Sequence, residues 1–252
     1  MLPVLPPTTT LSVIVPAYNE ENTILAVIES ILKALPDVHE VIVIDDGSSD
    51  RTAEIVKAHV DSYPCLHFIQ HPQNKGKTEA LKTGFAASTG DIVIVQDADL
   101  EYDPTDIPSV IDPICQGKAD VVYGSRFLVR RATRILYYRH YIANRFLTSL
   151  SNLLTDYNFS DVETGYKAFR GIIIRNMKIT STGFGFEIEV TAKVTKLKCR
   201  VYEVPISYYG RTYQEGKKIG LKDGLYALYC VIKYNLFCSL KGAYVHKPDL
   251  SS

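Results

Sequence analysis

Two aspartates separated by a single residue form the most chemically specific pattern in this sequence of 252 residues. Asp97 and Asp99 come shortly after the apolar run Ile92–Val95. In an extended segment this spacing places both carboxylates on the same side, where they repel each other unless a cation lies between them. Carboxylate oxygens suit Mg²⁺ or Mn²⁺, and such sites commonly take further ligands from the phosphates of a substrate. The pair therefore predicts a divalent-metal site for a phosphorylated substrate, with a solvated loop as the alternative interpretation.

Two further polar clusters follow apolar runs in the same way. Residues 16–20 read PAYNE and residues 45–50 read DDGSSD. In an open α/β sheet, ligands bind in the crevice beyond the carboxyl ends of the strands. Together with residues 96–101, these clusters predict one continuous crevice. For residues 45–50 alone, a turn followed by a helix cap is the simpler interpretation.

The elements that must position these clusters alternate along the chain. Short apolar runs without polar alternation are typical of strands buried on both faces. They are Leu11–Val15, Val41–Ile44, Leu66–Gln70, Ile92–Val95 and Val121–Tyr123. Helical segments are expected between them, at about 20–35, 50–60 and 77–87. This alternation predicts an α/β fold with a mainly parallel central sheet and flanking helices.

The phosphate-binding loops of other nucleotide enzymes are missing from the sequence. There is no GxxxxGK[ST] segment and no GxGxxG after the first strand, which argues against a P-loop NTPase and an NAD-type site. Lys77 opens the third expected helix, where it or the helix amides can approach a phosphate. An ordinary helix N-terminus is the alternative.

Charge is distributed unevenly although the net charge is zero. Residues 1–120 hold 19 acidic and 7 basic side chains, whereas residues 121–252 hold 9 and 21. The acidic half can hold a cation and the basic half can face phosphates or an anionic membrane, unless the halves only neutralise each other. The five scattered cysteines form no CxxC pair, which favours a reducing, cytoplasmic compartment. No signal peptide or transmembrane segment is evident.

Two segments in the basic half are candidates for contact with a membrane. Residues 135–155 are amphipathic and residues 225–240 are mostly apolar. An Arg-rich stretch leads into the tyrosines of 137–141, and consists of Arg126, Arg130, Arg131, Arg134 and Arg139. Arginine suits bidentate phosphate binding and tyrosine suits a membrane interface. The alternatives are a solvated basic helix and packing on the sheet. The Tyr-rich C-terminal segment is also a candidate interface for a homo-oligomer.

With these residues in view, the sequence resembles the inverting family 2 glycosyltransferases. Within them it is most similar to the polyprenyl-phosphate sugar synthases, the group of dolichol-phosphate mannose and glucose synthases. The matching segments are VIVPAYNE, VIVIDDGSSDRT, NKGKTEAL, GDIVIVQDADLEYDP, VVYGSRF, DVETGYKAFR, GFGFEIEV and EVPISYYGRTYQEGKKIGLKDG. The resemblance implies a Rossmann-like GT-A nucleotide-diphospho-sugar transferase fold. It also implies a single catalytic domain over 1–252, with a nucleotide and metal half at about 10–124, an acceptor half at about 125–224 and a helical tail at about 225–252.

The resemblance also implies roles for individual residues. The expected nucleotide-binding set is Pro16, Ala17, Tyr18, Asn19, Glu20, Asp46, Lys77, Asp97 and Ala98. Asp97 and Asp99 are expected to hold Mg²⁺ or Mn²⁺ at the diphosphate, with Glu101 as a further ligand. Arg126 is expected to face a phosphate of donor or acceptor. Arg211 and Lys218, the latter next to Lys217, match an element that closes over the diphosphate.

The expected reaction transfers a hexose from a nucleotide sugar of the GDP-mannose or UDP-glucose type to a polyprenyl phosphate. Such an acceptor oxygen is already anionic and needs no general base, only positive charge to hold it. A hydroxyl acceptor requires a base, and Asp161 and Glu163 are the candidates, with Glu187 and Glu189 as further available carboxylates in this half. Two alternatives stay open: a family 2 enzyme with a soluble polysaccharide or protein acceptor, and a non-enzymatic nucleotide-sugar binding module. A nucleic-acid partner is not expected, because the basic half carries no recognised reading motif. A membrane surface or membrane-anchored protein is the expected partner beyond the substrates.

Overall fold

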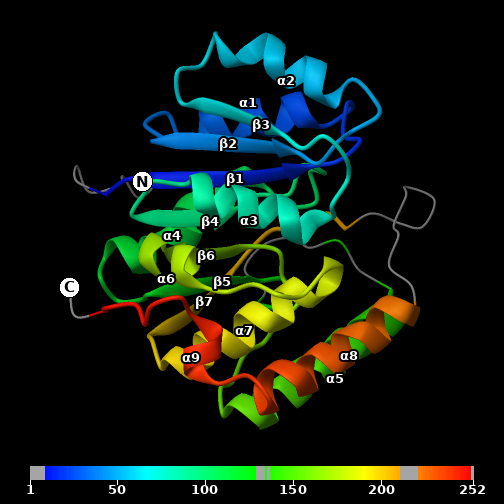
Figure 1. Cartoon of the computed structure of the whole chain (residues 1–252), viewed down its shortest axis with the longest axis vertical. Coiled ribbons are helices and arrows are strands. Elements are labelled where there is room, and N and C mark those ends of the chain that lie inside the picture. Colours follow the sequence, from blue (N-terminus) through cyan, green and yellow to red (C-terminus); the bar gives the residue numbers. More distant parts are fainter. Residues whose placement is uncertain (1–8, 129–133, 135–136, 211–220, 251–252) are drawn as a thin grey trace.

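A seven-stranded sheet forms the centre of the protein in the computed structural model, which describes residues 9–128, 134, 137–210 and 221–250. The strand order is β3-β2-β1-β4-β6-β5-β7 (Figure 1). The strands are β1 Leu11–Ala17, β2 Glu40–Asp45, β3 Leu66–Gln70, β4 Ile92–Val95, β5 Val121–Ser125, β6 Lys167–Arg170 and β7 Val201–Pro205. All neighbouring pairs are parallel except those of β6, which runs antiparallel to both β4 and β5. The predicted α/β class with a mainly parallel sheet is therefore confirmed.

Helices cover both faces of this sheet. They are α1 Ile24–Ala34, α2 Thr52–Val60, α3 Lys77–Ala87, α4 Ile107–Cys115, α5 Tyr138–Thr155, α6 Gly171–Asn176, α7 Phe186–Leu197, α8 Leu221–Leu236 and α9 Leu240–Ala243. Two 3₁₀ turns, η1 Pro104–Asp106 and η2 Gly183–Gly185, precede α4 and α7. The three helices predicted between the first strands correspond to α1, α2 and α3.

The hydrophobic core has two layers, one on each face of the sheet. Alternate residues of β1 contribute to different layers: Val13 and Val15 pack with α1, α2 and α4, whereas Ile14 packs with α3 and the later helices. This two-sided burial explains why the strands appear in the sequence as unbroken apolar runs. Helix α3 lies very close to the sheet, because a Cβ atom at Gly84 would come within 2.4 Å of Ile14.

The helices α5 and α8 pack against each other at one end of the molecule (Figure 1). Within the described ranges, no helix has both the length and the apolar character needed to cross a bilayer. In the segment expected as a C-terminal helical tail, helix α8 begins at Leu221.

Candidate functional site

The loops after β1 and β2 are joined directly to each other. The amide of Asp46 donates to the carbonyl of Ala17 over 2.8 Å, and the amide of Ser49 donates to the side-chain oxygen of Asn19 over 2.8 Å. Asn19 adopts a left-handed conformation with φ +55, in which asparagine is tolerated better than most residues. The first two polar clusters, including Pro16 and Ala17 at the end of β1 and exposed Tyr18, therefore share one end of the sheet. Glu20 lies beside them, where its carboxylate accepts from the Thr23 hydroxyl.

The Asp46 carboxylate is buried and binds other parts of the protein. It accepts hydrogen bonds from His71 Nδ1 at 2.7 Å, from the amide of Lys75 at 3.0 Å and from the amide of Gly76 at 2.7 Å. The other ring nitrogen of His71 lies 2.9 Å from the Thr83 hydroxyl. Asp46, which is expected to contact the nucleotide, also holds the loop that leads into α3. His71 was given no role, because a single histidine has no recognisable spacing to its distant partner.

The segment after β4 is a turn rather than the extended chain expected for Asp97 and Asp99. Residues 98–99 form the turn, and Leu100 follows in the left-handed region with φ +60. Asp99 Oδ1 accepts the amide of Glu101 at 3.1 Å, which stabilises the reversal. Ala98 is buried beneath it. Glu101 accepts a 2.6 Å hydrogen bond from the hydroxyl of Tyr208, so its carboxylate is engaged on the opposite side of the crevice.

A lysine pairs with the first of the two aspartates. Lys77 Nζ lies 2.7 Å from Asp97 Oδ1 and 3.8 Å from Glu187 Oε1. Burial works against the charged form of Lys77, but the carboxylates of Asp97 and Glu187 outweigh it and raise the pKa of the ammonium group. Helix α3, β4 and α7 thus contribute one side chain each to a charged group at the carboxyl ends of the strands.

The other oxygen of Asp97 lies against a glycine. A Cβ atom at Gly165 would come within 2.8 Å of Asp97 Oδ2 and 3.1 Å of the Tyr102 ring. The amide of Gly165 donates to the Tyr102 hydroxyl at 2.8 Å. Only glycine therefore fits at this position without moving the carboxylate.

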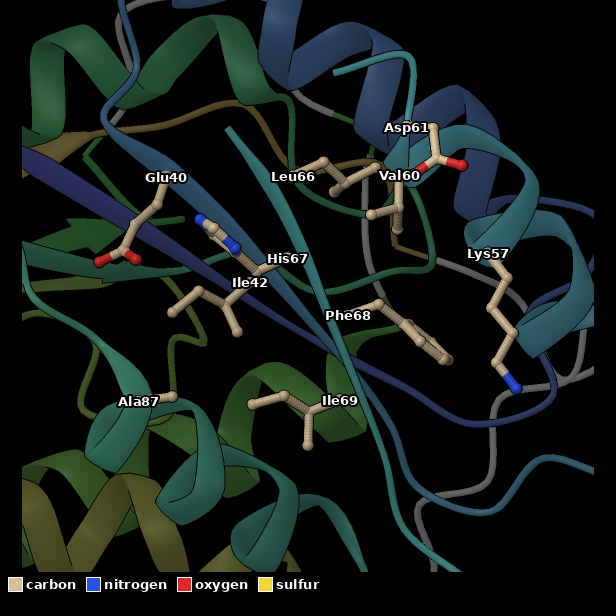
Figure 2. Close-up of a pocket in the computed structure, with 10 residues that line it drawn as sticks. All are labelled: Glu40, Ile42, Lys57, Val60, Asp61, Leu66, His67, Phe68, Ile69 and Ala87. Atoms are coloured by element: carbon tan, nitrogen blue, oxygen red, sulfur yellow. The ribbon is translucent and has the colours of Figure 1, made fainter. Parts of the chain in front are cut away.

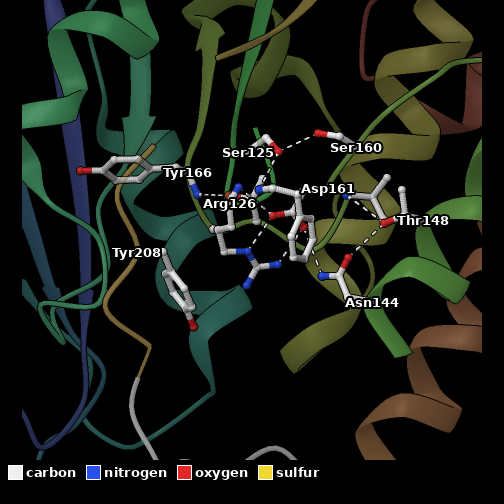
Figure 3. A network of polar contacts seen from close by, with 12 residues as sticks. Ser125, Arg126, Asn144, Thr148, Ser160, Asp161, Tyr166 and Tyr208 are labelled. Carbon is white, nitrogen blue, oxygen red and sulfur yellow. Dashed lines mark hydrogen bonds and ion pairs between the residues drawn. The ribbon is translucent and has the colours of Figure 1, made fainter. Parts of the chain in front are cut away.

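Arg126 and Asp161 form a buried bidentate ion pair (Figure 3). Arg126 Nε lies 2.6 Å from Asp161 Oδ2, and its terminal nitrogen lies 2.8 Å from Oδ1. Asn144 adds a third donor at 3.2 Å. Burial alone would raise the pKa of Asp161, but Arg126 and these hydrogen bonds lower it. The Asp161 carboxylate is therefore ionised and fully occupied in orienting the guanidinium group.

Two carboxylates near this pair have buried oxygens with no hydrogen-bond partner among the described residues. They are Oε1 of Glu163 and Oε2 of Glu187. Burial and the neighbouring charge of Glu187 raise the pKa of Glu163 to about 8. Lys167 is fully buried, donates to the carbonyls of Val162 and Thr164, and has a pKa lowered by burial to about 8. The raised pKa favours the protonated form of Glu163, which can donate a hydrogen bond.

Three aromatic rings in contact, one pair stacked and the other tilted by 48°, connect the aspartate turn to the arginine. The rings of Tyr102 and Tyr166 have centroids 4.9 Å apart, and those of Tyr102 and Tyr208 are 5.2 Å apart. The guanidinium of Arg126 lies 5.1 Å from the centre of the Tyr208 ring. The Tyr166 hydroxyl donates to the side chain of Gln96 directly after β4. This packing fixes the distance between the two charged groups of the crevice.

The chemistry of this donor set fits a hard divalent cation. Asp97 and Asp99 supply carboxylate oxygens, and Glu187 has a buried oxygen without a partner close to Lys77. In the part of the chain that the structure describes, no three His, Cys, Asp or Glu side chains converge as a complete metal site. A cation here would need further ligands from its substrate. Arg130, Arg131, Arg211, Lys217 and Lys218 lie outside the described residues.

A hollow on the surface lies elsewhere, along the edge strand β3 (Figure 2). It has a volume of about 720 Å³ and is lined by side chains that include Lys57, His67, Phe68 and Ile69. None of its lining residues belongs to the predicted site. The candidate site is instead the charged crevice at the carboxyl ends of the strands.

Comparison with known proteins bears on this crevice. Residues 12–176 match the model of the glycosyl transferase family 2 domain, and this segment includes both aspartates, Lys77, Arg126 and Asp161. The chain belongs to glycosyl transferase family 2. This assignment agrees with the family resemblance carried by the sequence motifs.

Curated relatives in this family include lipid-phosphate enzymes. The chain is 31% identical over 212 residues to a dolichol-phosphate mannosyltransferase of Pyrococcus furiosus, a match that covers 83% of this chain and 59% of that protein. It is 28% identical over 221 residues to a polyprenol monophosphomannose synthase of Mycolicibacterium smegmatis, covering 85% of this chain and 83% of that protein. The chain thus spans less than two thirds of the length of the Pyrococcus relative.

Solved structures of the GT-A type share the fold of this family 2 chain. Glucosyl-3-phosphoglycerate synthase from Mycobacterium tuberculosis, in complex with Mn²⁺, UDP and phosphoglyceric acid, superposes with a TM-score of 0.70 at 24% identity. The match covers 91% of this chain and 79% of that one. The same enzyme is also known with Mg²⁺ and UDP. The expected GT-A architecture is confirmed by this likeness.

Proposed function

We propose that this family 2 enzyme transfers a hexose from a nucleotide sugar to a polyprenyl phosphate and depends on a divalent metal ion. The single observation that carries the proposal is the crevice in which Asp97 and the Asp161-anchored Arg126 face each other across three tyrosines whose rings are in contact. One end supplies carboxylates for a metal-bound diphosphate and the other supplies a fixed positive charge for an anionic acceptor.

The donor is assigned to the end of the crevice formed by β1, β2 and β4. Asp97 and Asp99 would hold Mg²⁺ or Mn²⁺. Glu101, whose amide donates to Asp99, would be a further ligand. The metal would offset negative charge on the leaving nucleoside diphosphate. Lys77 lies beside Asp97 and can contact a phosphate, as the neighbouring PAYNE segment can contact the nucleotide. Arg211 and Lys218 are proposed to contribute further charge to the diphosphate.

The carboxylates near Arg126 favour an acceptor that is already anionic. Asp161 is occupied by its ion pair, and a lowered pKa makes it a weak base. Burial and the charge of Glu187 raise the pKa of Glu163, which favours its protonated form and leaves less carboxylate to take a proton from a hydroxyl at neutral pH. An acceptor phosphate needs no base and would gain from the guanidinium of Arg126 and a hydrogen bond from Glu163. We therefore assign Arg126 to the acceptor phosphate and Asp161 to its positioning.

The outer surface of α5 and α8 supports a lipid acceptor. Exposed apolar residues recur at helical spacing on both helices: Tyr138, Ile142, Phe146 and Leu153 on α5, and Leu225, Tyr229, Ile232 and Leu236 on α8. Leu153 is 78% exposed, and Phe237 just after α8 is 80% exposed. Arg139, Arg145 and Lys222 are basic and exposed on the same helices. This combination is typical of interfacial helices that lie on an anionic membrane. The relatives named as dolichol- and polyprenol-phosphate enzymes agree with this acceptor class.

The membrane surface can be tested separately from catalysis. Phe146→Glu places a charge in the exposed stripe and should abolish sedimentation with vesicles that contain anionic lipid. The melting temperature should stay unchanged, because the Phe146 side chain is exposed. Glu29→Gln, on the distant helix α1, is the matched surface control. Equal sedimentation of wild type and Phe146→Glu would contradict the assignment of this face.

The proposed reaction is tested by a panel of nucleotide sugars with Mg²⁺ or Mn²⁺. Nucleotide release is measured with and without a short-chain polyprenyl phosphate. Release that requires both the lipid and the metal is the expected result, and it identifies the donor at the same time. Release that ignores the lipid would favour a soluble acceptor, and binding of donor without any release would favour a nucleotide-sugar binding module.

A further inference from the structure

We propose that Lys77 acts as a tethered counter-ion. Its ammonium group pairs with the carboxylates that would attract the divalent metal ion, until metal and nucleotide arrive together. The inference rests on the proposed function, since it assumes a metal at Asp97. This role of Lys77 is additional to its proposed contact with a phosphate. By this account Lys77 suppresses binding of the metal on its own and makes metal and nucleotide binding depend on each other.

The backbone that carries Lys77 is fixed by a buried network. The amides of Lys75 and Gly76, immediately before it, both donate to the Asp46 carboxylate. Asp46 is itself held by His71, whose ring also contacts Thr83 on the second turn of α3. Gly76 has φ +90, a conformation that favours glycine and directs the chain into α3. The fold therefore fixes the backbone position from which the Lys77 side chain extends.

The ammonium group of Lys77 ends between two carboxylates. It lies 2.7 Å from Asp97 Oδ1 and 3.8 Å from Glu187 Oε1. The second oxygen of Glu187 is buried and has no partner among the described residues. The single ammonium group of Lys77 thus lies beside two carboxylates, those of Asp97 and Glu187. A divalent cation would be drawn to the same oxygens.

The Lys77 side chain can also leave this position. Its relative exposure is 36%, in contrast to 17% for Asp97 and 8% for Glu187. A metal ion that binds alone must displace the ammonium or accept repulsion from it at a distance of a few ångströms. A metal ion that arrives with a diphosphate brings an anion to which the ammonium can turn. The same lysine therefore opposes metal binding in the first case and favours it in the second.

The test measures binding of Mn²⁺ by calorimetry, in the absence of any sugar. Lys77→Met should bind Mn²⁺ alone about five- to tenfold more tightly than wild type, as expected for loss of one like charge near a partly exposed site. Its affinity for Mn²⁺ with UDP or GDP should be weaker than that of wild type. Lys77→Arg keeps the charge and should behave like wild type in the metal-only titration. Asp97→Asn should abolish specific Mn²⁺ binding, which would locate the metal site at Asp97.

The matched control is Lys82→Met on the same helix, where Lys82 pairs with Glu79 away from the aspartates. It should change neither titration. If Lys77→Met binds Mn²⁺ no more tightly than wild type, the counter-ion role is wrong, even when the wild type transfers sugar normally. If wild type shows no metal-dependent transfer with any donor, the proposed function itself fails. Should Lys77→Met not fold, Lys77→Gln provides the same loss of charge.

Discussion

Replacement of Asp161 by asparagine tests how the crevice holds its positive charge. Asp161→Asn keeps the size and the hydrogen-bonding shape of the side chain but removes its charge. The Asp161 side chain is fully buried and Arg126 is 12% exposed, so the guanidinium would keep its charge without a counter-charge. Breaking a buried ion pair by removing one partner costs about 3–5 kcal/mol. Because asparagine still accepts a hydrogen bond from Arg126, we expect about 3 kcal/mol, the lower end of that range.

The loss should depend on pH in a defined direction. The folded protein holds the pKa of Asp161 below its ordinary value of 3.8. Its contribution to stability is therefore fully present above about pH 4 and is lost as the pH falls through the folded value. The difference in unfolding free energy between wild type and Asp161→Asn should be constant from pH 5 to 7 and should shrink in acid.

Urea denaturation of four proteins completes the experiment: wild type, Asp161→Asn, Arg126→Gln and the double variant. The double variant should lose less than the sum of the two single losses, by about 2 kcal/mol, since the residues contact each other. Glu79→Gln, which breaks an exposed pair with Lys82, should cost less than about 1 kcal/mol. A loss of orientation at Arg126 should also lower kcat/KM about 100-fold. Strict additivity, or a fully stable and active Asp161→Asn, would refute the reasoning.

Three further predictions concern the rest of the crevice. Gly165→Ala places a Cβ 2.8 Å from Asp97 Oδ2, so metal affinity and transfer should fall together, whereas an unchanged Mn²⁺ titration would show that Asp97 is not held as described. Glu163→Gln should flatten the pH dependence of the unfolding free energy between pH 5 and 7.5. Burial raises the pKa of Glu163 from 4.5 to about 8, so the wild type becomes less stable as the pH rises, by up to about 1.4 kcal/mol per pH unit. Equal slopes for both proteins in urea titrations would count against the buried acid. Asp99→Ala should abolish nucleotide release and leave the melting temperature unchanged, since Asp99 lies in a turn beyond the core, and a collapse of the melting temperature would instead point to a structural role.

The sheet could be predicted from the sequence because most of its strands are buried on both faces. Such strands appear as apolar runs, and β1, β2, β4 and β5 all lie where those runs do. Strand β6 was not predicted as a strand. Its sequence begins with Lys167, whose burial is compensated by the carbonyls of Val162 and Thr164, a solution that only the folded loop creates.

The hydrogen-bond and ion-pair partners of the predicted site residues could not be inferred from the sequence. Asp161 and Glu163 looked equivalent as bases, yet Arg126 keeps the first ionised and burial keeps the second protonated. Asp46 was expected on the nucleotide, and its actual partners include a histidine 25 positions away. The turn at Asp97 and Asp99 depends on the left-handed Leu100, a residue type that gives no sign of that conformation in the sequence.

The central claim is that the crevice transfers a hexose onto a lipid phosphate with the help of a metal at Asp97. The most direct measurement follows radiolabelled hexose from the nucleotide sugar identified by the donor panel into an organic-soluble product. Wild type with Mn²⁺ and a polyprenyl phosphate should give labelled lipid, which should disappear with EDTA and with Asp97→Asn. Label that stays in the aqueous phase while nucleotide is released, or labelled lipid that survives in Asp97→Asn, would contradict the account.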